Sequence, residues 1–309
     1  MNVPARLAAF AVVLGLAFGG AALAGAAIDP TDEDAVVADS GHGGDEPATG
    51  ATDSRGGKHG EGDVTDGGGE HASSGPALSG LAISQDGFTL EPERTYFNAN
   101  QKAPFRFQIS DDRGRVIRDE YELESERELH LIVARRDTAV YEHLHPRKGQ
   151  DGTWRVQMPA LEPGVYRAFA DFQIGGKKRA LATDLFVPGD FQPTRVPEPK
   201  PVSEVDDFSV AIAAAQPPQE GKATNVVFRI NRDGRPFERL ERYLGARGHL
   251  VALREGDLGY LHVHPEEGAG GNAVAFEATF PTAGRYRLFF QFQTGGRVRT
   301  VAYTLEVPR

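Results

Sequence analysis

Beyond residue 77, hydrophobic and polar positions alternate in short runs that are separated by Gly- and Asp-rich turns. A period of two is typical of half-buried β-strands, and long runs of helical period are missing. The first half of this region predicts strands at residues Leu81–Ser84, Phe88–Leu90, Pro104–Ile109, Glu128–Arg135, Val140–His145, Thr153–Met158, Val165–Ile174 and Arg179–Val187. The second half predicts strands at Phe208–Ala213, Thr224–Asn231, His249–Arg254, Tyr260–His264, Ala273–Phe280, Arg285–Thr294 and Arg297–Val307.

Seven or eight short strands in about 100 residues are typical of an antiparallel β-sandwich. The Cys–Trp–Cys pattern of antibody domains is absent because the chain has no Cys. We therefore predict an all-β fold of two tandem immunoglobulin-like antiparallel sandwiches, at residues 78–190 and 204–309. A Pro-rich linker over residues 191–203 joins them.

The two predicted sandwiches carry the same motif. The string ELHLIVARRDTAVYEHLHP, residues 128–146, aligns with RGHLVALREGDLGYLHVHP, residues 247–265, at a constant offset of 119. Further along, PGVYRAFADFQIGG from Pro163 aligns with AGRYRLFFQFQTGG from Ala283 at an offset of 120. Agreement over this length indicates an internal duplication.

The first 77 residues differ in composition from the rest. Arg6 is the single charged side chain of residues 1–27, and residues 7–27 are apolar or Gly, which predicts an export signal that is either cleaved or kept as a membrane anchor. Residues 28–77 contain 12 Gly, 12 acidic residues and 2 basic ones, and no Phe, Trp, Tyr, Leu or Met, as in a disordered tether. We expect the sandwiches to lie outside the cytoplasm, secreted or at the extracytoplasmic face of the cell membrane.

Charge and sulfur content exclude several classes of function. The net charge of −10 comes from the tether, because the remaining chain holds 32 basic and 32 acidic residues, so no nucleic-acid-binding surface is expected. The absence of Cys excludes thiolate-ligated zinc, iron–sulfur clusters and blue-copper sites. With two Met, a Met-rich copper(I) carrier is excluded as well.

Each repeat contains three histidines with the same spacing, and residues i and i+2 of a strand face the same side. In the second repeat, a two-residue turn at Gly256-Asp257 pairs residues whose numbers add to 513, which places His249 opposite His264 and diagonal to His262. In the first repeat, pairs adding to 275 place His130 opposite His145, near His143. The turn there, Asp-Thr, is weaker, and a four-residue loop would preserve the shared face.

Three neutral imidazoles on one face suit copper(II) or zinc, with copper favoured. We therefore predict one ion per repeat, bound by His130, His143 and His145 in the first and by His249, His262 and His264 in the second. Carboxylates that could complete the shell are Glu142, Glu266 and Glu267, of which Glu142 is the weakest candidate because it alternates to the opposite face. Tyr141 and Tyr260 share the histidine face as hydrogen-bond donors.

The alternative interpretation is that the histidines bond loop carbonyls and that the protein is a tethered surface interaction module. An enzyme is not expected, because the sequence offers no nucleophile elbow, phosphate loop or separate general base. Asp171 and Gln291 occupy matching positions but differ in type, which argues against an acid–base mechanism common to both repeats.

The motif HLIV, then YxHLHP, then GxYRxFxDF, resembles a loosely defined set of exported, largely uncharacterised bacterial proteins that often lie near heavy-metal handling functions. The resemblance covers residues 128–187 well and residues 247–307 with departures, including Gln291 in place of Asp. The resemblance assigns no activity and favours metal handling only modestly. From the histidines and the predicted export signal, we expect a role in envelope metal buffering or delivery, with a metal ion and an envelope protein as partners.

Overall fold

The computed structural model describes residues 78–309 except residue 215 and residues 267–268, and for His262 and His264 it describes the backbone alone. All described residues belong to one compact unit of the chain. The predicted signal or anchor and the predicted tether lie outside the described residues. Within the described range there are strands and turns but no helix, so none of these residues forms a helix that could cross a membrane.

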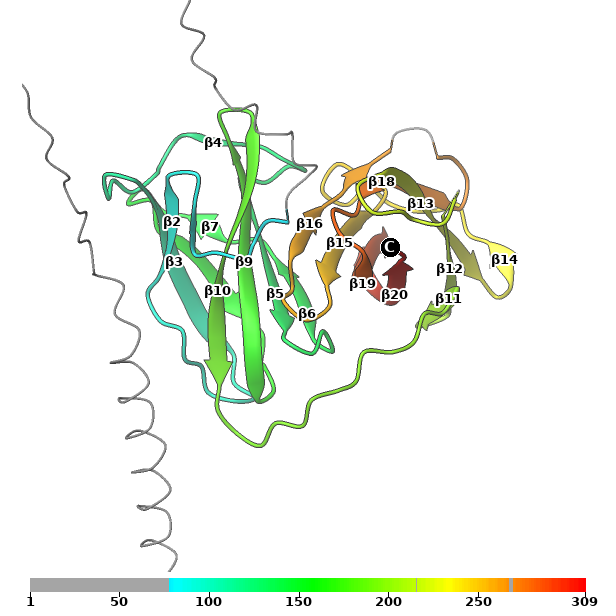
Figure 1. Ribbon diagram of the computed structural model, residues 1–309, viewed down its shortest axis with the longest axis horizontal. Coiled ribbons are helices and arrows are strands. Elements are labelled where there is room, and N and C mark those ends of the chain that lie inside the picture. Colours follow the sequence, from blue (N-terminus) through cyan, green and yellow to red (C-terminus); the bar gives the residue numbers. More distant parts are fainter. Residues whose placement is uncertain (1–77, 215, 267–268) are drawn as a thin grey trace, which may run out of the picture. The chain divides into compact units, whose positions relative to one another are not determined.

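The first sandwich packs two antiparallel sheets face to face (Figure 1). One sheet has the order β1-β2-β3-β8-β7, and the other has the order β10-β9-β5-β6, with β4 also paired to β9. The strands are β1 Ser84–Gln85, β2 Phe88–Pro92, β3 Ala103–Asp111, β4 Tyr121–Glu122, β5 Leu129–Arg135, β6 Tyr141–Leu144, β7 Arg147–Lys148, β8 Trp154–Met158, β9 Gly164–Ile174 and β10 Lys177–Val187.

The second sandwich repeats this plan. Its sheets have the orders β11-β12-β13-β18-β17, with β14 paired to β13, and β16-β15-β19-β20. The strands are β11 Val202–Val205, β12 Phe208–Ala214, β13 Ala223–Arg232, β14 Arg235–Pro236, β15 His249–Arg254, β16 Tyr260–His262, β17 His264–Pro265, β18 Ala273–Thr279, β19 Gly284–Thr294 and β20 Arg297–Val307. The predicted all-β fold of two immunoglobulin-like sandwiches is confirmed.

The core of each sandwich lies between its own two sheets, as the alternation predicted. In β3 the inward positions Phe105, Phe107 and Ile109 are almost fully buried. In the second sandwich, Phe228 of β13 stacks on Phe290 of β19 with ring centroids 4.1 Å apart. The strands that the alternation did not predict, β4, β7, β11, β14 and β17, have two to four residues, too few to establish a period.

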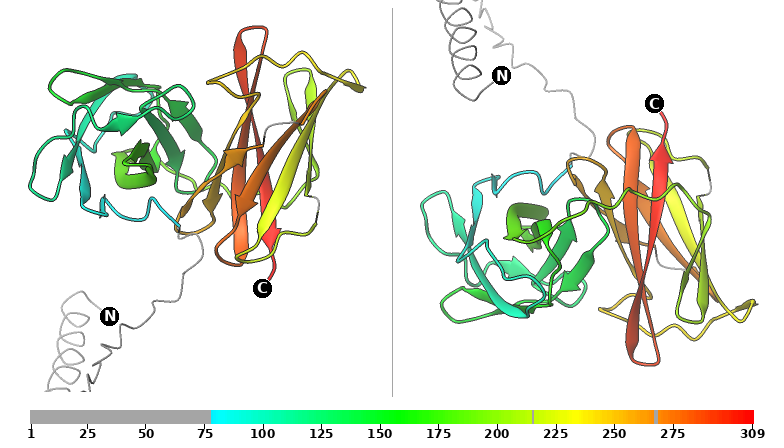
Figure 2. Two further views of the ribbon diagram at one scale, coloured as in Figure 1. Left: turned by 90° about the horizontal axis from the view of Figure 1, so that it is seen from above. Right: turned by 90° about the horizontal axis from the view of Figure 1, so that it is seen from below.

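A third apolar cluster joins the two sandwiches. Strand β5 is buried at all seven positions, because one of its faces lines the first core and the other packs against the second sandwich. The sheets β10-β9-β5-β6 and β16-β15-β19-β20 supply this cluster and lie side by side in both views of Figure 2. Its buried members are Ile132, Ala134, Phe169, Ala180, Ala182, Val251, Leu253, Leu258, Tyr260 and Phe289.

The junction between the sandwiches has the reciprocal contacts of a two-fold interface. Tyr141 of the first repeat stacks on Phe289 of the second, with ring centroids 4.2 Å apart and planes inclined by 8°. The equivalent residues make the equivalent contact, because Phe169 lies 5.3 Å from Tyr260. A self-complementary patch of this kind is characteristic of isologous dimers, and here both copies belong to one chain.

The first described residues also connect the two sandwiches. Ser79 exchanges backbone hydrogen bonds with Tyr260 of β16, at 3.1 and 2.9 Å. One residue later, the Gly80 amide donates to the carbonyl of Ala180 in β10, at 2.8 Å. Gly80 has φ +68°, and a Cβ there would approach the Phe169 ring to 2.5 Å, so the crossing between the two sheets requires glycine.

Candidate metal centre

The histidine hairpins have the predicted register in both repeats. Strands β5 and β6 pair residues whose numbers add to 275, such as Leu131 with Leu144. Strands β15 and β16 pair residues whose numbers add to 513, such as Val251 with His262. The predicted sums are therefore confirmed. Val251, two residues after His249, lies on the outer face of its sheet, in the cluster between the sandwiches.

The loops of these hairpins differ from the prediction. Backbone bonds from Arg135 to Val140 and from Arg254 to Gly259 close them, so each loop has four residues instead of two. In each loop an aspartate accepts a hydrogen bond from the Nε of that arginine, at 2.8 Å in the first repeat and 3.0 Å in the second. This ion pair secures the wider loop, and an even number of loop residues keeps the same side chains on the outer face.

The prediction that His264 lies opposite His249 is wrong. Strand β16 ends at His262, and His264 belongs to β17, where it pairs with Glu277 in the other sheet of the sandwich. Val263, between them, is buried in the second core. The chain therefore changes sheets at this point, and Pro265, which has no amide hydrogen, lies on an edge strand, as prolines in sheets do. The side chains of His262 and His264 lie outside the described atoms, so their role as ligands stays a prediction.

The histidines of the first repeat do converge. Candidate ligand atoms of His130, His143 and His145 all lie within 4.8 Å of one another. Their ring centroids are 5.1 Å apart for His130 and His143, 5.3 Å for His130 and His145, and 4.8 Å for His143 and His145. His130 lies on β5, His143 on β6, and His145 just beyond the end of β6. The three residues therefore form a group that could hold one metal ion.

A tight turn fixes the orientation of His130. Residues 124–127 form a turn in which Ser125 and Glu126 both have positive φ, and Glu124 and Arg127 exchange backbone hydrogen bonds. The Glu124 carbonyl left beside the turn lies 3.0 Å from His130 Nε2. A carbonyl accepts only, so Nε2 carries a proton, and the tautomer with this proton has an unprotonated Nδ1 toward the cluster.

Gln291 of the second repeat orients His143. Its Oε1 lies 2.7 Å from His143 Nδ1, and its Nε2 donates to Thr300 at 2.9 Å. In this amide orientation Nδ1 of His143 is the donor, and Nε2 is bare. That Nε2 lies 2.9 Å from Nδ1 of His130, so in this amide orientation two imidazole lone pairs face each other, whereas the reversed amide would make the contact a hydrogen bond.

His145 also offers a nitrogen. Its Nε2 is buried and has no hydrogen-bond partner. Burial lowers the pKa of His145 to about 4. Burial, reinforced by the His130 and His145 rings, holds the pKa of His143 well below its usual range. His143 and His145 are therefore neutral at pH 7, which is the form that binds a metal ion.

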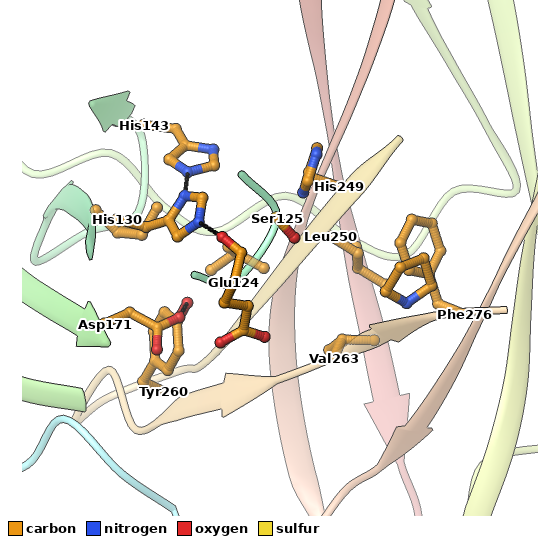
Figure 3. A pocket seen from close by; sticks show the side chains of 13 residues that line it. Glu124, Ser125, His130, His143, Asp171, His249, Leu250, Tyr260, Val263 and Phe276 are labelled. Carbon is orange, nitrogen blue, oxygen red and sulfur yellow. Dashed lines mark hydrogen bonds between the residues drawn. The ribbon is translucent and has the colours of Figure 1, made fainter. Parts of the chain in front are cut away.

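Two histidines of the trio, His130 and His143, line a cavity of about 50 Å³ between the two repeats. Figure 3 shows His130 and His143 on its wall with Glu124 and Asp171, and His249 and Tyr260 of the second repeat on the same cavity. Tyr260 donates its hydroxyl to Asp171 Oδ2 at 2.7 Å. A cavity of this size is large enough for an ion or for a few ordered waters.

The other candidate residues have different surroundings. Glu142 pairs with Val133, whose side chain lies in the first core, so the carboxylate faces away from the trio. Glu266 is exposed, and Glu267 is outside the described residues. Tyr141 is in the cluster between the sandwiches, and no described hydrogen bond joins it or Tyr260 to a described histidine ring.

Sequence reasoning did not identify Gln291 as a neighbour of His143 or the Glu124 carbonyl as a partner of His130. The first contact crosses between repeats, and nothing in a repeat's own pattern indicates which face meets the other copy. The sequence did contain an indication of the second contact. Glu124 and Tyr243 are equivalent by the 119-residue offset, and each precedes its histidine by six residues.

The comparisons with known proteins support the duplication. The sequence profile of a family described as "Domain of unknown function (DUF8832)" matches residues 83–189 and again residues 203–309. No curated protein matches the chain.

Among solved structures, a DUF4426 family protein from Pseudomonas aeruginosa is 11% identical, covering 35% of this chain and 97% of its own, with a TM-score of 0.25. The Escherichia coli adhesin FdeC is 11% identical over 74% of this chain and 66% of its own, with a TM-score of 0.24. Domains 4 and 5 of the S-layer protein SbsC are 10% identical over 74% of this chain and 100% of theirs, with a TM-score of 0.20. Scores this low say nothing about function.

Proposed function

The chain belongs to the DUF8832 family, whose description assigns no activity, and we propose from its residues that it is an extracytoplasmic metal-binding protein that buffers or delivers copper(II). The metal would be bound by His130, His143 and His145. The extracytoplasmic location rests on the apolar residues 7–27 and on the acidic, Gly-rich stretch that follows them.

The observation that carries the proposal is the pair of facing nitrogens in the trio. Nδ1 of His130 and Nε2 of His143 are 2.9 Å apart, and the outer nitrogen of each ring lies against an oxygen that only accepts. A metal-binding histidine typically donates its other ring N–H to such an acceptor. A cation beside the two inner nitrogens would relieve the repulsion between their lone pairs.

The spacing favours copper(II) over zinc. Metal–imidazole bonds are about 2.0 Å long, so two nitrogens 2.9 Å apart subtend roughly 90° at a shared ion. That angle is closer to the tetragonal geometry of copper(II) than to the tetrahedral geometry of zinc. The bare, buried Nε2 of His145 supplies a third nitrogen.

The second candidate function is a tethered surface interaction module with structural histidines. The bond between His130 and the Glu124 carbonyl supports it, because a buried imidazole satisfied by a loop carbonyl needs no metal. In that case the His143→Gln variant, which keeps a polar side chain, would fold normally and the wild type would not bind copper.

The test is calorimetric titration of the whole chain with copper(II) and with zinc. The background carries Gln in place of His42, His59 and His71, so that the histidines of residues 28–77 add no signal. We expect copper(II) to bind more tightly than zinc, and His143→Gln to abolish this binding without loss of the folded far-ultraviolet spectrum. Absence of binding by the folded background protein would refute the proposal.

A further inference from the structure

We infer that the metal site is shared by the two repeats, with His249 as a fourth imidazole and Gln291 as the residue that sets the tautomer of His143. This rests on the proposed function, and it replaces one ion per repeat with one ion at the junction. Both residues belong to the second sandwich, whereas the trio belongs to the first.

A tight turn orients His249 in the same way as the turn at residues 124–127 orients His130. Residues 243–246 form the same tight turn as residues 124–127, with positive φ at both central positions and exchanged hydrogen bonds between its ends. His249 Nε2 lies 2.7 Å from the Tyr243 carbonyl, six residues upstream, as His130 Nε2 lies against Glu124. His249 therefore carries its proton on Nε2 and presents a bare Nδ1.

His249 lines the same cavity as His130 and His143. Its ring centroid is 6.1 Å from that of His143, compared with 4.8 to 5.3 Å within the trio. Two imidazoles that bind one ion through bonds of about 2.0 Å have their ring centres roughly 4.5 to 6 Å apart, depending on the angle at the ion. Little more than a rotation of the ring about its own side-chain bonds would bring Nδ1 to a shared ion.

Gln291 can serve the site with and without metal. With its Oε1 toward His143, it accepts the Nδ1 proton and leaves Nε2 bare for the metal. After a half-turn of the amide, its nitrogen would donate to Nδ1, and His143 Nε2–H could then donate to His130, which satisfies the metal-free cluster. Thr300 can accept from the amide nitrogen or donate to the amide oxygen, so it fits either orientation.

Gln291 is thus a positioning residue on the opposite sandwich. Substitutions at this position distinguish its role in the metal-bound cluster from its role in the metal-free cluster. Glu at this position can accept from Nδ1 but cannot donate, so Gln291→Glu would preserve the tautomer that binds metal. Leu can do neither. Gln293, two residues further along β19, bonds Glu241 instead of a histidine and provides a matched control.

The experiment titrates the whole chain, in the background without His42, His59 and His71, with copper(II) and counts the nitrogen ligands from the hyperfine structure of the electron paramagnetic resonance spectrum. We expect one copper(II) per chain with four nitrogens. His249→Gln should reduce the count to three and weaken binding by about tenfold or more. Gln291→Leu should weaken binding by roughly 10–100-fold, as the loss of an outer hydrogen-bond partner does. Gln293→Leu should bind copper(II) as the background does, and Gln291→Glu, which keeps the acceptor for His143 Nδ1, should bind it at least as tightly.

The outcomes separate this inference from the function on which it rests. If the folded background protein binds no copper(II), the proposed function fails. If it binds copper(II) through the trio, but His249→Gln keeps the nitrogen count and Gln291→Leu keeps the affinity, the function stands and the shared site is refuted. Two ions per chain, lost separately in His143→Gln and His262→Gln, would also refute it in favour of one site per repeat.

Discussion

Removal of one ring from the junction should destabilise the sandwich that does not contain it. Phe289 lies on β19 of the second sandwich, is 3% exposed, and stacks on Tyr141 of the first with centroids 4.2 Å apart. The substitution Phe289→Ala removes this contact and leaves the second core, which lies on the other face of the strand, intact.

The size of the effect follows from burial. A buried Phe removes about 150–250 Å² from water, worth roughly 4–6 kcal/mol at 25 cal/mol per Å². Measured Phe→Ala substitutions in cores cost about 3–5 kcal/mol. The stacking geometry of the pair adds about 1 kcal/mol, which a double-mutant cycle with Tyr141→Ala should recover as a coupling energy.

The chain provides its own reporter for this experiment. Trp154 is the single Trp of the sequence, and it is buried in the core of the first sandwich. Its fluorescence during urea unfolding therefore follows the first sandwich, whereas far-ultraviolet circular dichroism follows both. We expect the two transitions to coincide in the wild type, and we expect Phe289→Ala to lower the midpoint seen by Trp154 although the change is in the other sandwich.

The neighbouring residue is a matched control. Phe290 follows on β19 but stacks on Phe228 in the second core, so Tyr141→Ala and Phe290→Ala should be additive within about 0.5 kcal/mol. An unchanged Trp154 transition in Phe289→Ala would show that the sandwiches unfold independently. A coupling energy between Tyr141 and Phe289 no larger than that of the control pair would equally refute the reasoning.

Three further predictions concern the same junction. The folded pKa values of His143 and His145 lie below the unfolded value of about 6.5, so unfolding takes up protons. The stability of the metal-free protein is therefore complete above pH 6.5 and falls as the pH drops toward 4, by up to about 1.4 kcal/mol per pH unit for each ring. Urea midpoints at pH 7 and pH 5 in the presence of a chelator check this, and His145→Gln should flatten the pH dependence. Tyr141→Phe removes a buried hydroxyl without a partner and should be neutral or stabilising by about 1 kcal/mol, whereas Tyr260→Phe removes the donor to a buried carboxylate and should cost about 1–3 kcal/mol in urea unfolding. Gly80→Ala places a Cβ against an aromatic ring at a positive φ and should lower the thermal midpoint through a loss of at least about 1 kcal/mol, and an unchanged midpoint would contradict the assigned crossing.

The local geometry of the histidine hairpins was predictable from the sequence because it depends on neighbours in the chain. The sums of 275 and 513 follow from the position of the turn, and the alternation of side chains then places His143 on the outer face. The same reasoning did not reveal the change of sheet at Val263. The chain changes sheets there because Val263 is buried in the second core, among residues distant in sequence.

The association of the two histidine faces was not predictable for a related reason. Ile132 and Val251 each follow a histidine by two residues and share its face, but an apolar outer face indicates only that something covers it. The duplication supplies the missing reason, because two copies of one apolar face can cover each other. Gln291 gained its contact with His143 through this pairing, and no pattern within either repeat contains it.

The two repeats differ at one pair of equivalent polar residues beside the cavity, and this difference explains the hydrogen bonds at the junction. Asp171 and Gln291 are equivalent, and each lies directly opposite a histidine across its sheet, His130 in the first case and His249 in the second. Across the junction, however, Asp171 accepts the Tyr260 hydroxyl, whereas Gln291 meets a histidine. Aspartate in both positions would bury two carboxylates at one cavity, which is costly without a bound cation. With an amide in one copy, the cavity contains one carboxylate instead of two. The loss of symmetry between the repeats is therefore what the proposed shared site would need, both to persist without metal and to favour a divalent ion.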